Sequence, residues 1–180
     1  MFRVGQRSAE GEQFTSLLAA HIGIVRKIST IYCRNADDRS DLVQDIIARL
    51  WDAWPRYDPT RPFSTWMYRV SLNVAISHVR HAYRQKRHFV PFDIDQHETA
   101  DLEVDHEASQ QSAALQTAIA ELDPMNRALL LLYLEERSHH EIGEILGISE
   151  SNVGTKIARV AHRLRIRFSE MSEGSIHGTR

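Results

Sequence analysis

Cysteine is nearly absent from this sequence, and that scarcity limits what the chain can be. Only one of its 180 residues, Cys33, is a cysteine. The chain therefore cannot form an internal disulfide, and we expect it in a reducing compartment, the cytoplasm. No apolar stretch approaches the roughly 20 residues of a membrane helix. The apolar segment 17–25 is interrupted by His21 and lacks a cleavage site, so we expect neither a signal peptide nor membrane insertion.

The sequence also lacks the patterns of common catalytic sites. It has no nucleophile motif, no glycine-rich phosphate loop and no paired carboxylates in an apolar setting. Two histidine pairs could ligate a metal, His78 with His81, whose three-residue helical spacing suits zinc, and His139 with His140. No further ligand lies near the first pair, and His139 opens a predicted helix, where it would meet solvent. We expect no catalytic residue, no metal, no cofactor and no enzymatic activity.

Charge is nearly balanced in sum but unevenly distributed. The formal net charge is −2, and 42% hydrophobic residues are enough for a substantial core. Basic residues concentrate in 61–87 and 156–167, whereas 93–123 contains no Lys or Arg. No Asp or Glu lies between Asp58 and Asp93. Separate basic surfaces of this kind indicate contact with nucleic acid.

The segment 63–87 is the element around which we expect the chain to be organised. At 3.6 residues per turn, one continuous stripe combines an indole, an amide, a hydroxyl and three guanidiniums: Trp66, Arg69, Asn73, Ser77, Arg80 and Arg84. Apolar stripes on both flanks predict a helix wedged into a bundle, with only this edge exposed. Guanidiniums suit phosphates, an aromatic face suits an unstacked base, and an amide can read a base edge. An ordinary solvated face is the alternative, but such faces usually mix both signs of charge.

The elements before this helix predict a compact bundle over 12–88. After a flexible tail at 1–11, apolar residues recur at helical spacing from Glu12 to Cys33. A second helix is predicted over 41–54, with Ser40 as its N-cap. The loop 55–62 holds three prolines and is expected to be ordered by their stiffness. The acidic stretch 89–110, which has little periodicity, then predicts a flexible linker.

The C-terminal part predicts a helix-turn-helix domain over 111–168, followed by a flexible tail at 169–180. Asp123 and Pro124 form an N-cap and first helical position, and Ser138 with Glu141 forms a capping box. Gly147 ends the short helix that follows, and Ser149 caps a longer basic helix. The sequence therefore predicts an all-α chain of two helical domains joined by an acidic flexible linker.

The outer face of the last helix carries the second candidate DNA surface: Ser151, Asn152, Thr155, Lys156, Arg159 and Arg163. Small polar residues near its start, with arginines farther along, match base contacts followed by phosphate anchoring. A helical hairpin without a DNA role is the alternative.

With these elements in order, the span 12–167 resembles the sigma factors of bacterial RNA polymerase, in their small two-domain extracytoplasmic-function form. No single segment is decisive, but their order and spacing are highly specific. The resemblance is carried by Asp41-Leu-Val-Gln-Asp45 with Leu50-Trp51, Phe63-Ser-Thr-Trp-Met-Tyr-Arg-Val with Asn73, Leu122-Asp-Pro, and Glu141-Ile-Gly-Glu-Ile-Leu-Gly-Ile-Ser149.

The resemblance implies partners and roles. The helix that starts at 41 would dock on the clamp coiled coil of the polymerase β′ subunit through Asp41, Gln44, Asp45, Arg49 and Trp51. The β flap, promoter DNA and an anti-sigma factor would be further partners. The loop with Tyr57 and Arg61 would hold a flipped-out base of the −10 element. Trp66 and Asn73 would lie at the upstream edge of the melted region, and the last helix would enter the major groove at the −35 element.

The function implied is that of an alternative sigma factor, which binds core polymerase, recognises the −35 and −10 elements and helps to melt the −10 region. The linker would thread toward the path of the RNA, where its acids would imitate a nucleic-acid backbone. A helix-turn-helix regulator with an N-terminal sensing or dimerisation bundle is the alternative function. Two departures matter. Where housekeeping sigma factors carry a paired aromatic for melting, this chain has Arg69-Val70; the resemblance makes this usual for the small form and implies dependence on a well-matched promoter. At Gly154 the family often has Lys or Arg, which would shift base reading to Asn152, Thr155 and Arg159.

Overall fold

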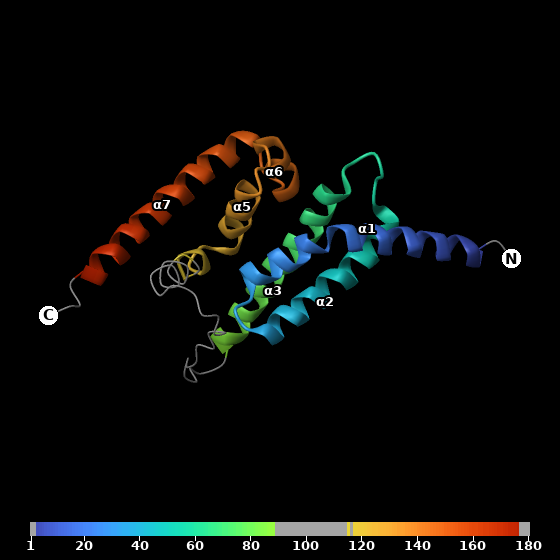
Figure 1. Ribbon diagram of the computed structural model, residues 1–180, viewed down its shortest axis with the longest axis horizontal. Helices are drawn as coiled ribbons and strands as arrows, with labels where there is room; N and C mark the ends of the chain where they lie inside the picture. Colours follow the sequence, from blue (N-terminus) through green and yellow to red (C-terminus); the bar gives the residue numbers. More distant parts are fainter. Residues whose placement is uncertain (1–2, 89–114, 116, 177–180) are drawn as a thin grey trace. The chain divides into compact units, whose positions relative to one another are not determined.

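The chain forms two helical units, each described here by itself (Figure 1). The structure, a computed structural model, describes the backbone of residues 3–88, 115 and 117–176, and the side chains of 10–84, 115 and 117–167. The units are Met1–Phe89 and Val90–Arg180. The prediction of an all-α chain with two helical domains is confirmed. The predicted acidic linker, 89–110, lies outside the described residues.

The first unit is a three-helix bundle with a short 3₁₀ turn. It contains α1 (Arg3–Tyr32), α2 (Ala36–Ala53), η1 (Trp54–Arg56) and α3 (Phe63–His88). The three α-helices pack against one another, because each places apolar residues at steps of three and four on one side. The side chains at the centre are fully buried: Val25, Ile28, Leu42, Ile46, Leu50, Met67, Tyr68 and Leu72.

Helix α2 begins at Ala36, earlier than the predicted start at Asp41. Asn35 is its N-cap, and its side-chain oxygen accepts a hydrogen bond from the backbone N–H of Asp38 at 2.7 Å. The acids Asp37 and Asp38 stabilise this first turn through the helix dipole. The prediction that Ser40 is the N-cap is therefore wrong. Apolar periodicity, on which that prediction relied, starts only at Leu42.

Both segments predicted as flexible tails are helical where the structure describes them. Helix α1 starts at Arg3, and α7 (Glu150–Ile176) continues to Ile176. Neither extension contains a proline. Extending an existing helix avoids the cost of nucleating a new one, so these polar ends can continue a helix whose other part is packed.

The second unit contains α5 (Pro124–Leu134), α6 (His139–Leu146) and α7. The predicted caps are confirmed. The Asp123 carboxylate accepts from the backbone of Met125 and Asn126, and Ser138 forms a capping box with Glu141. The α5, α6 and α7 helices pack around a shared core that includes Ala128, Leu129, Leu132, Ile142, Ile145, Val153 and Val160.

Two glycines shape the turn between α6 and α7. Gly147 adopts a left-handed conformation, with φ of 70°, as the predicted helix end requires. A Cβ on Gly143 would lie 2.8 Å from the carbonyl oxygen of Ile148, so a larger residue would push α6 away from the turn. These glycines set the close approach of the two helices.

A buried arginine fixes the segment that precedes α5. Arg127 is 7% exposed, and its Nη2 donates to the carbonyl oxygens of Ala120 at 2.7 Å and Leu122 at 3.2 Å. Glu121 in the same segment pairs with Arg167 of α7 through two hydrogen bonds, at 2.8 and 3.0 Å. The end of the preceding helix is thus attached to both α5 and α7.

Among the helices that the structure describes, none has the length and apolar character needed to cross a membrane.

Candidate nucleic-acid and protein interfaces

A cluster of aromatic rings joins η1 to the start of α3. Trp54 and Tyr57 are stacked, with ring centroids 5.2 Å apart and an interplanar angle of 18°. Trp66 approaches Tyr57 at 5.1 Å and Phe63 at 5.4 Å. The indole of Trp66 is therefore half-buried, with only part of its surface available at the predicted polar edge. Such ring pairs stabilise the fold by more than the burial of their apolar area alone. The cluster therefore holds the adjoining loop in place.

The loop 57–62 is held by its own hydrogen bonds as well as by its prolines. The Tyr57 hydroxyl donates to the carbonyl oxygen of Arg61 at 2.9 Å, and the Arg61 N–H donates to the carbonyl oxygen of Asp58 at 3.1 Å. The Asp58 carboxylate accepts from the Thr60 hydroxyl at 2.7 Å and from its N–H at 3.0 Å. These bonds, the Thr60 hydroxyl first, hold the pKa of Asp58 below its usual value. The loop is thus preorganised, and its carboxylate stays charged.

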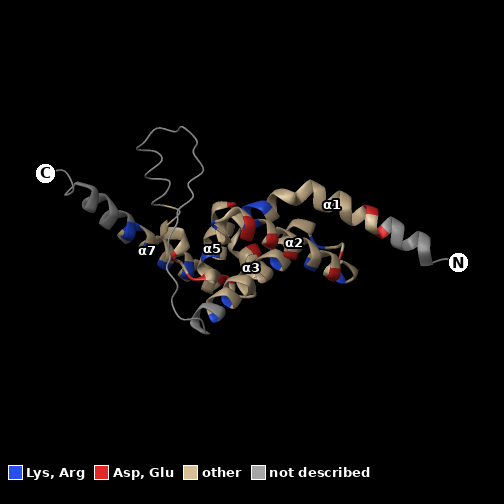
Figure 2. Ribbon diagram, turned by 90° about the horizontal axis from the view of Figure 1, so that it is seen from below, with Lys and Arg blue, Asp and Glu red and all other residues tan. Residues whose placement is uncertain are grey.

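Apart from the half-buried Trp66, the residues of the stripe predicted on α3 are exposed. Arg69, Asn73, Ser77, Arg80 and Arg84 are all exposed. Met67 and Leu72 on the flanks are buried, as the wedged position of this helix predicts. The Ser77 hydroxyl donates to the Asn73 carbonyl oxygen at 2.8 Å, so its hydrogen is already used within the helix. Basic residues gather toward the C-terminal part of α3, as Figure 2 shows.

Helices α1 and α2 form a different surface, an apolar groove beside an exposed tryptophan. Trp51 is 49% exposed. Its ring lies edge-on against Phe14 at 5.1 Å, and a Cβ on Gly11 would be 3.7 Å from its Cη2 atom. The groove has a volume of about 500 Å³, and its walls are Phe14, Thr15, Leu18, Gln44, Ile47, Ala48 and Trp51. The indole is therefore held in place while half of its surface remains open.

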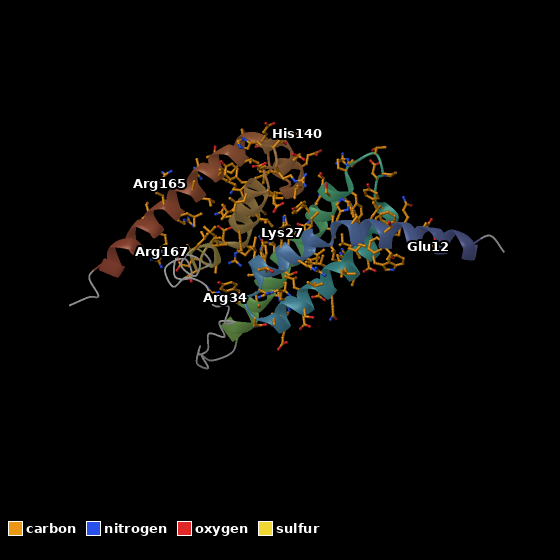
Figure 3. All side chains as sticks on the ribbon, in the orientation of Figure 1. Glu12, Lys27, Arg34, His140, Arg165 and Arg167 are labelled. Carbon is orange, nitrogen blue, oxygen red and sulfur yellow. The ribbon has the colours of Figure 1, made fainter. Side chains whose placement is uncertain are left out.

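The surroundings of this groove are mostly acidic. Asp41, Asp45 and Asp52 are exposed on α2, and Glu12 is exposed on α1 (Figure 3). Arg49 is the exposed base among them. Such a surface repels a phosphate backbone but suits a basic protein partner. The α2 residues Gln44 and Trp51, predicted to contact a partner, line this groove. Its α1 wall was not predicted, and the available signal for this surface was a Trp among acids.

The histidine pair predicted not to bind a metal shows one contact between helices. His78 Nδ1 of α3 lies 3.9 Å from Asp45 Oδ2 of α2. Within the described residues, no group of three His, Cys, Asp or Glu side chains could hold a metal ion.

The face predicted on the last helix is present on α7, with one difference. Ser151, Asn152, Thr155, Arg159 and Arg163 are exposed, whereas Lys156 is half-buried. The Thr155 hydroxyl donates to the Ser151 carbonyl oxygen at 3.1 Å. The amide and the two guanidiniums are therefore the groups best able to reach a ligand.

Comparison with known proteins places both units in one family. Residues 17–85 match the family model "Sigma-70 region 2", and residues 112–164 match "Sigma-70, region 4". The chain is 30% identical over 152 residues to the ECF RNA polymerase sigma factor SigE of Mycolicibacterium smegmatis, which covers 83% of this chain but only 59% of that relative. It is 27% identical over 171 residues to the RNA polymerase sigma factor NccH of Alcaligenes xylosoxydans xylosoxydans, covering 89% of this chain and 90% of that one.

A solved structure supports the fold. The sigma factor RpoE from Bartonella quintana, in complex with the anti-sigma factor NepR, matches with a TM-score of 0.66 and 17% sequence identity. The match covers 88% of this chain and 98% of that one.

Proposed function

The chain belongs to the sigma-70 family, in its extracytoplasmic-function form, and on that premise we propose how it directs promoter-specific transcription initiation. The proposal assigns core polymerase binding to the α1–α2 groove, −10 recognition to α3 and the preceding loop, and −35 recognition to α7. The observation that carries it is that the first unit has two different surfaces. One is an apolar groove with an exposed tryptophan and acidic surroundings, and the other is a stripe of exposed arginines without acids.

Core polymerase would dock on the groove. A preformed apolar groove with a fixed, half-exposed aromatic ring has the features of a binding hot spot. The acids Asp41 and Asp45 at its side, with Gln44 and Arg49, would bind charged and polar groups of the β′ clamp, and the Trp51 ring would supply the apolar anchor. The ring needs little ordering when it binds, because it already packs edge-on against Phe14.

Promoter DNA would meet α3 at the −10 element. The loop with Tyr57 and Arg61 would hold the flipped-out base, because its backbone is fixed before DNA arrives. The exposed part of Trp66 and the amide of Asn73 would border the melted region. Arg69, Arg80 and Arg84 would hold phosphates, with Ser77 beside them.

The −35 element would be read by α7. Asn152 can bind a base edge with two hydrogen bonds, and Arg159 and Arg163 suit guanine or phosphate. Ser151, Thr155 and the half-buried Lys156 would complete the contact. A β-flap contact, an anti-sigma partner and a cytoplasmic location are part of the same proposal. Catalysis would belong to the polymerase.

The test is charge reversal at the groove. Asp45→Arg should abolish co-elution of the chain with core RNA polymerase, because the Asp45 side chain is 65% exposed and the change leaves the core intact. Asp45→Asn should give an intermediate loss, and Glu144→Arg, an exposed change on α6, should have no effect. Circular dichroism would verify the fold of each variant. Normal co-elution of Asp45→Arg, or tight duplex binding by the free chain alone, would favour a helix-turn-helix regulator instead.

A further inference from the structure

The interface between α2 and α3 brings an imidazole beside a carboxylate that we assign to polymerase docking. His78 Nδ1 of α3 lies 3.9 Å from Asp45 Oδ2 of α2. The His78 side chain is 30% exposed and the Asp45 side chain is 65% exposed, so solvent reaches both groups. A neutral imidazole at this distance is too far away to form a hydrogen bond, whereas an imidazolium is within ion-pair distance. The strength of the contact therefore depends on the charge of the ring.

Neither group is engaged elsewhere. Among the residues that the structure describes, the His78 ring and the Asp45 carboxylate have only each other as polar partners. Histidine is the side chain whose charge changes between about pH 5 and 8. A change of pH within this range can therefore convert the contact into an ion pair without breaking any other bond of the two side chains.

The charged groups that face His78 from α2 lie in one stripe. Asp41 precedes Asp45 by about one turn and Arg49 follows it by about one turn, and both are exposed. Arg49 is the cation nearest to Asp45 along α2. Protonation of His78 would therefore add a second positive charge beside the carboxylate, on the side of α3.

The other elements add few charges near this contact. On α3 itself, His81 is exposed about one turn after His78. Helix α1 also packs against α3, and its titratable contact there is His21, whose ring lies 5.2 Å from that of Phe63. Phe63 begins α3 about four turns before His78. The Asp45 carboxylate is thus the group that a charge on His78 affects most directly.

We propose that His78 is a positioning residue for polymerase docking: its neutral ring leaves the Asp45 carboxylate available to a basic group of core polymerase, and its protonated ring competes for that carboxylate. This inference rests on the proposed docking of core polymerase at α2. The imidazolium also repels the incoming basic group, so both effects weaken docking in acid. Because ion pairs between exposed side chains are modest, the expected change is about 3-fold.

The experiment measures the affinity of the full chain for core RNA polymerase at about pH 7.5 and about pH 6. His78→Gln keeps a polar side chain without charge, and His78→Lys carries a permanent charge. His78→Gln should equal the wild type at the higher pH and bind about 3-fold more tightly than the wild type at the lower pH. His78→Lys should bind about 3-fold more weakly than the wild type at the higher pH and equal it at the lower pH. Each comparison is made with the wild type at the same pH, so the pH dependence of the polymerase itself cancels.

Two controls test whether His78 acts through Asp45. His140→Gln removes an exposed imidazole from α6 and should follow the wild type at both pH values. In an Asp45→Asn background, His78→Gln should no longer change the pH dependence, because the carboxylate for which the ring competes is gone. Thermal melts at both pH values verify that every variant is folded. Parallel pH profiles of the wild type and His78→Gln would overturn the proposal, as would an equal shift in His140→Gln or an undiminished effect of His78→Gln beside Asp45→Asn.

Asp45→Arg separates this inference from the proposed function. If Asp45→Arg abolishes core binding and His78→Gln leaves the pH profile unchanged, only the role of His78 is wrong. If Asp45→Arg binds core polymerase normally, the assignment of docking to this face of α2 is wrong as well.

Discussion

The hydroxyl of Tyr57 gives the sharpest test of the preorganised loop. Tyr57→Phe removes the hydrogen bond to the Arg61 carbonyl oxygen, which is 2.9 Å long. The ring itself is retained, so its stacking on Trp54 and its contact with Trp66 should persist. The substitution therefore changes the stiffness of the loop while leaving its aromatic base in place.

The size of the effect follows from the exposure of this bond. An intramolecular hydrogen bond stabilises a fold by about 0.5–1.5 kcal/mol net, and this one is exposed. The lower half of that range is appropriate, because the Asp58–Thr60 bonds still hold the turn. If only the closed loop holds the −10 base, discrimination between the correct base and a wrong one should fall by about 2- to 5-fold.

Run-off transcription with reconstituted holoenzyme would measure this ratio on promoters that differ at the flipped position of the −10 element. Tyr83→Phe is the matched control, because Tyr83 is 65% exposed on α3 and undergoes the same chemical change. Discrimination at the −35 element should be unaltered in both variants. If discrimination at the −10 element is unchanged in Tyr57→Phe, or changes equally in Tyr83→Phe, then the hydrogen bond from Tyr57 to Arg61 does not contribute to base selection.

Four further predictions concern the second unit and the charge pattern. Arg127→Met should lower the unfolding free energy by about 1.5–3 kcal/mol in urea titration, because it leaves the Ala120 and Leu122 carbonyls without their donor; an unchanged midpoint would contradict that role. Ser138→Ala should cost about 1 kcal/mol through loss of the capping box. The lowered pKa of Glu141 means that its carboxylate stabilises the fold above the ordinary value of 4.5, and that this stability is lost as the pH falls through the lowered pKa. The thermal stability advantage of the wild type over Glu141→Gln should therefore shrink in acid, and a constant difference would disprove it. Finally, replacing the acids of the linker 89–110 by Asn and Gln, while keeping Glu121 and Asp123 for their structural contacts, should raise the affinity of the free chain for promoter DNA, since the linker acids can compete with phosphate within a Debye length of about 8 Å. Tight, specific binding by the unmodified free chain would exclude such competition.

Local chemistry explains which parts of the fold could be predicted from the sequence. The capping box at Ser138 and Glu141, and the left-handed Gly147, each depend on residues within one turn of each other. Their chemistry therefore appears directly in the sequence. The stripe on α3 was predictable for a similar reason, because the 3.6-residue period determines which side chains share a face.

Contacts between segments could not be predicted in the same way. The groove beside Trp51 depends on how α1 packs against α2, where Phe14 meets the Trp51 ring edge-on. The ring of His139 reaches Gly154 only because the turn at Gly147 brings α6 back against α7. In the aromatic cluster, a 3₁₀ turn places Tyr57 so that its ring stacks on Trp54. The prolines of this segment predicted a stiff loop, but not this turn. Each of these contacts depends on how two segments pack against each other, and the periodicity of a single segment does not determine that packing.

The boundary between the acidic and basic faces of the first unit has a consequence for how the two partners act together. Asp45 of α2 lies 3.9 Å from His78 of α3, which follows Ser77 of the exposed stripe. Between the two helices, Ile46 and Met67 are fully buried, and close-packed cores transmit displacement instead of absorbing it. A polymerase docked on α2 would therefore also fix the orientation of α3, because the two helices are rigidly packed against each other. The proposed DNA contacts of α3 would then form within one assembled complex, and the resulting effective concentration would strengthen phosphate contacts that are individually weak.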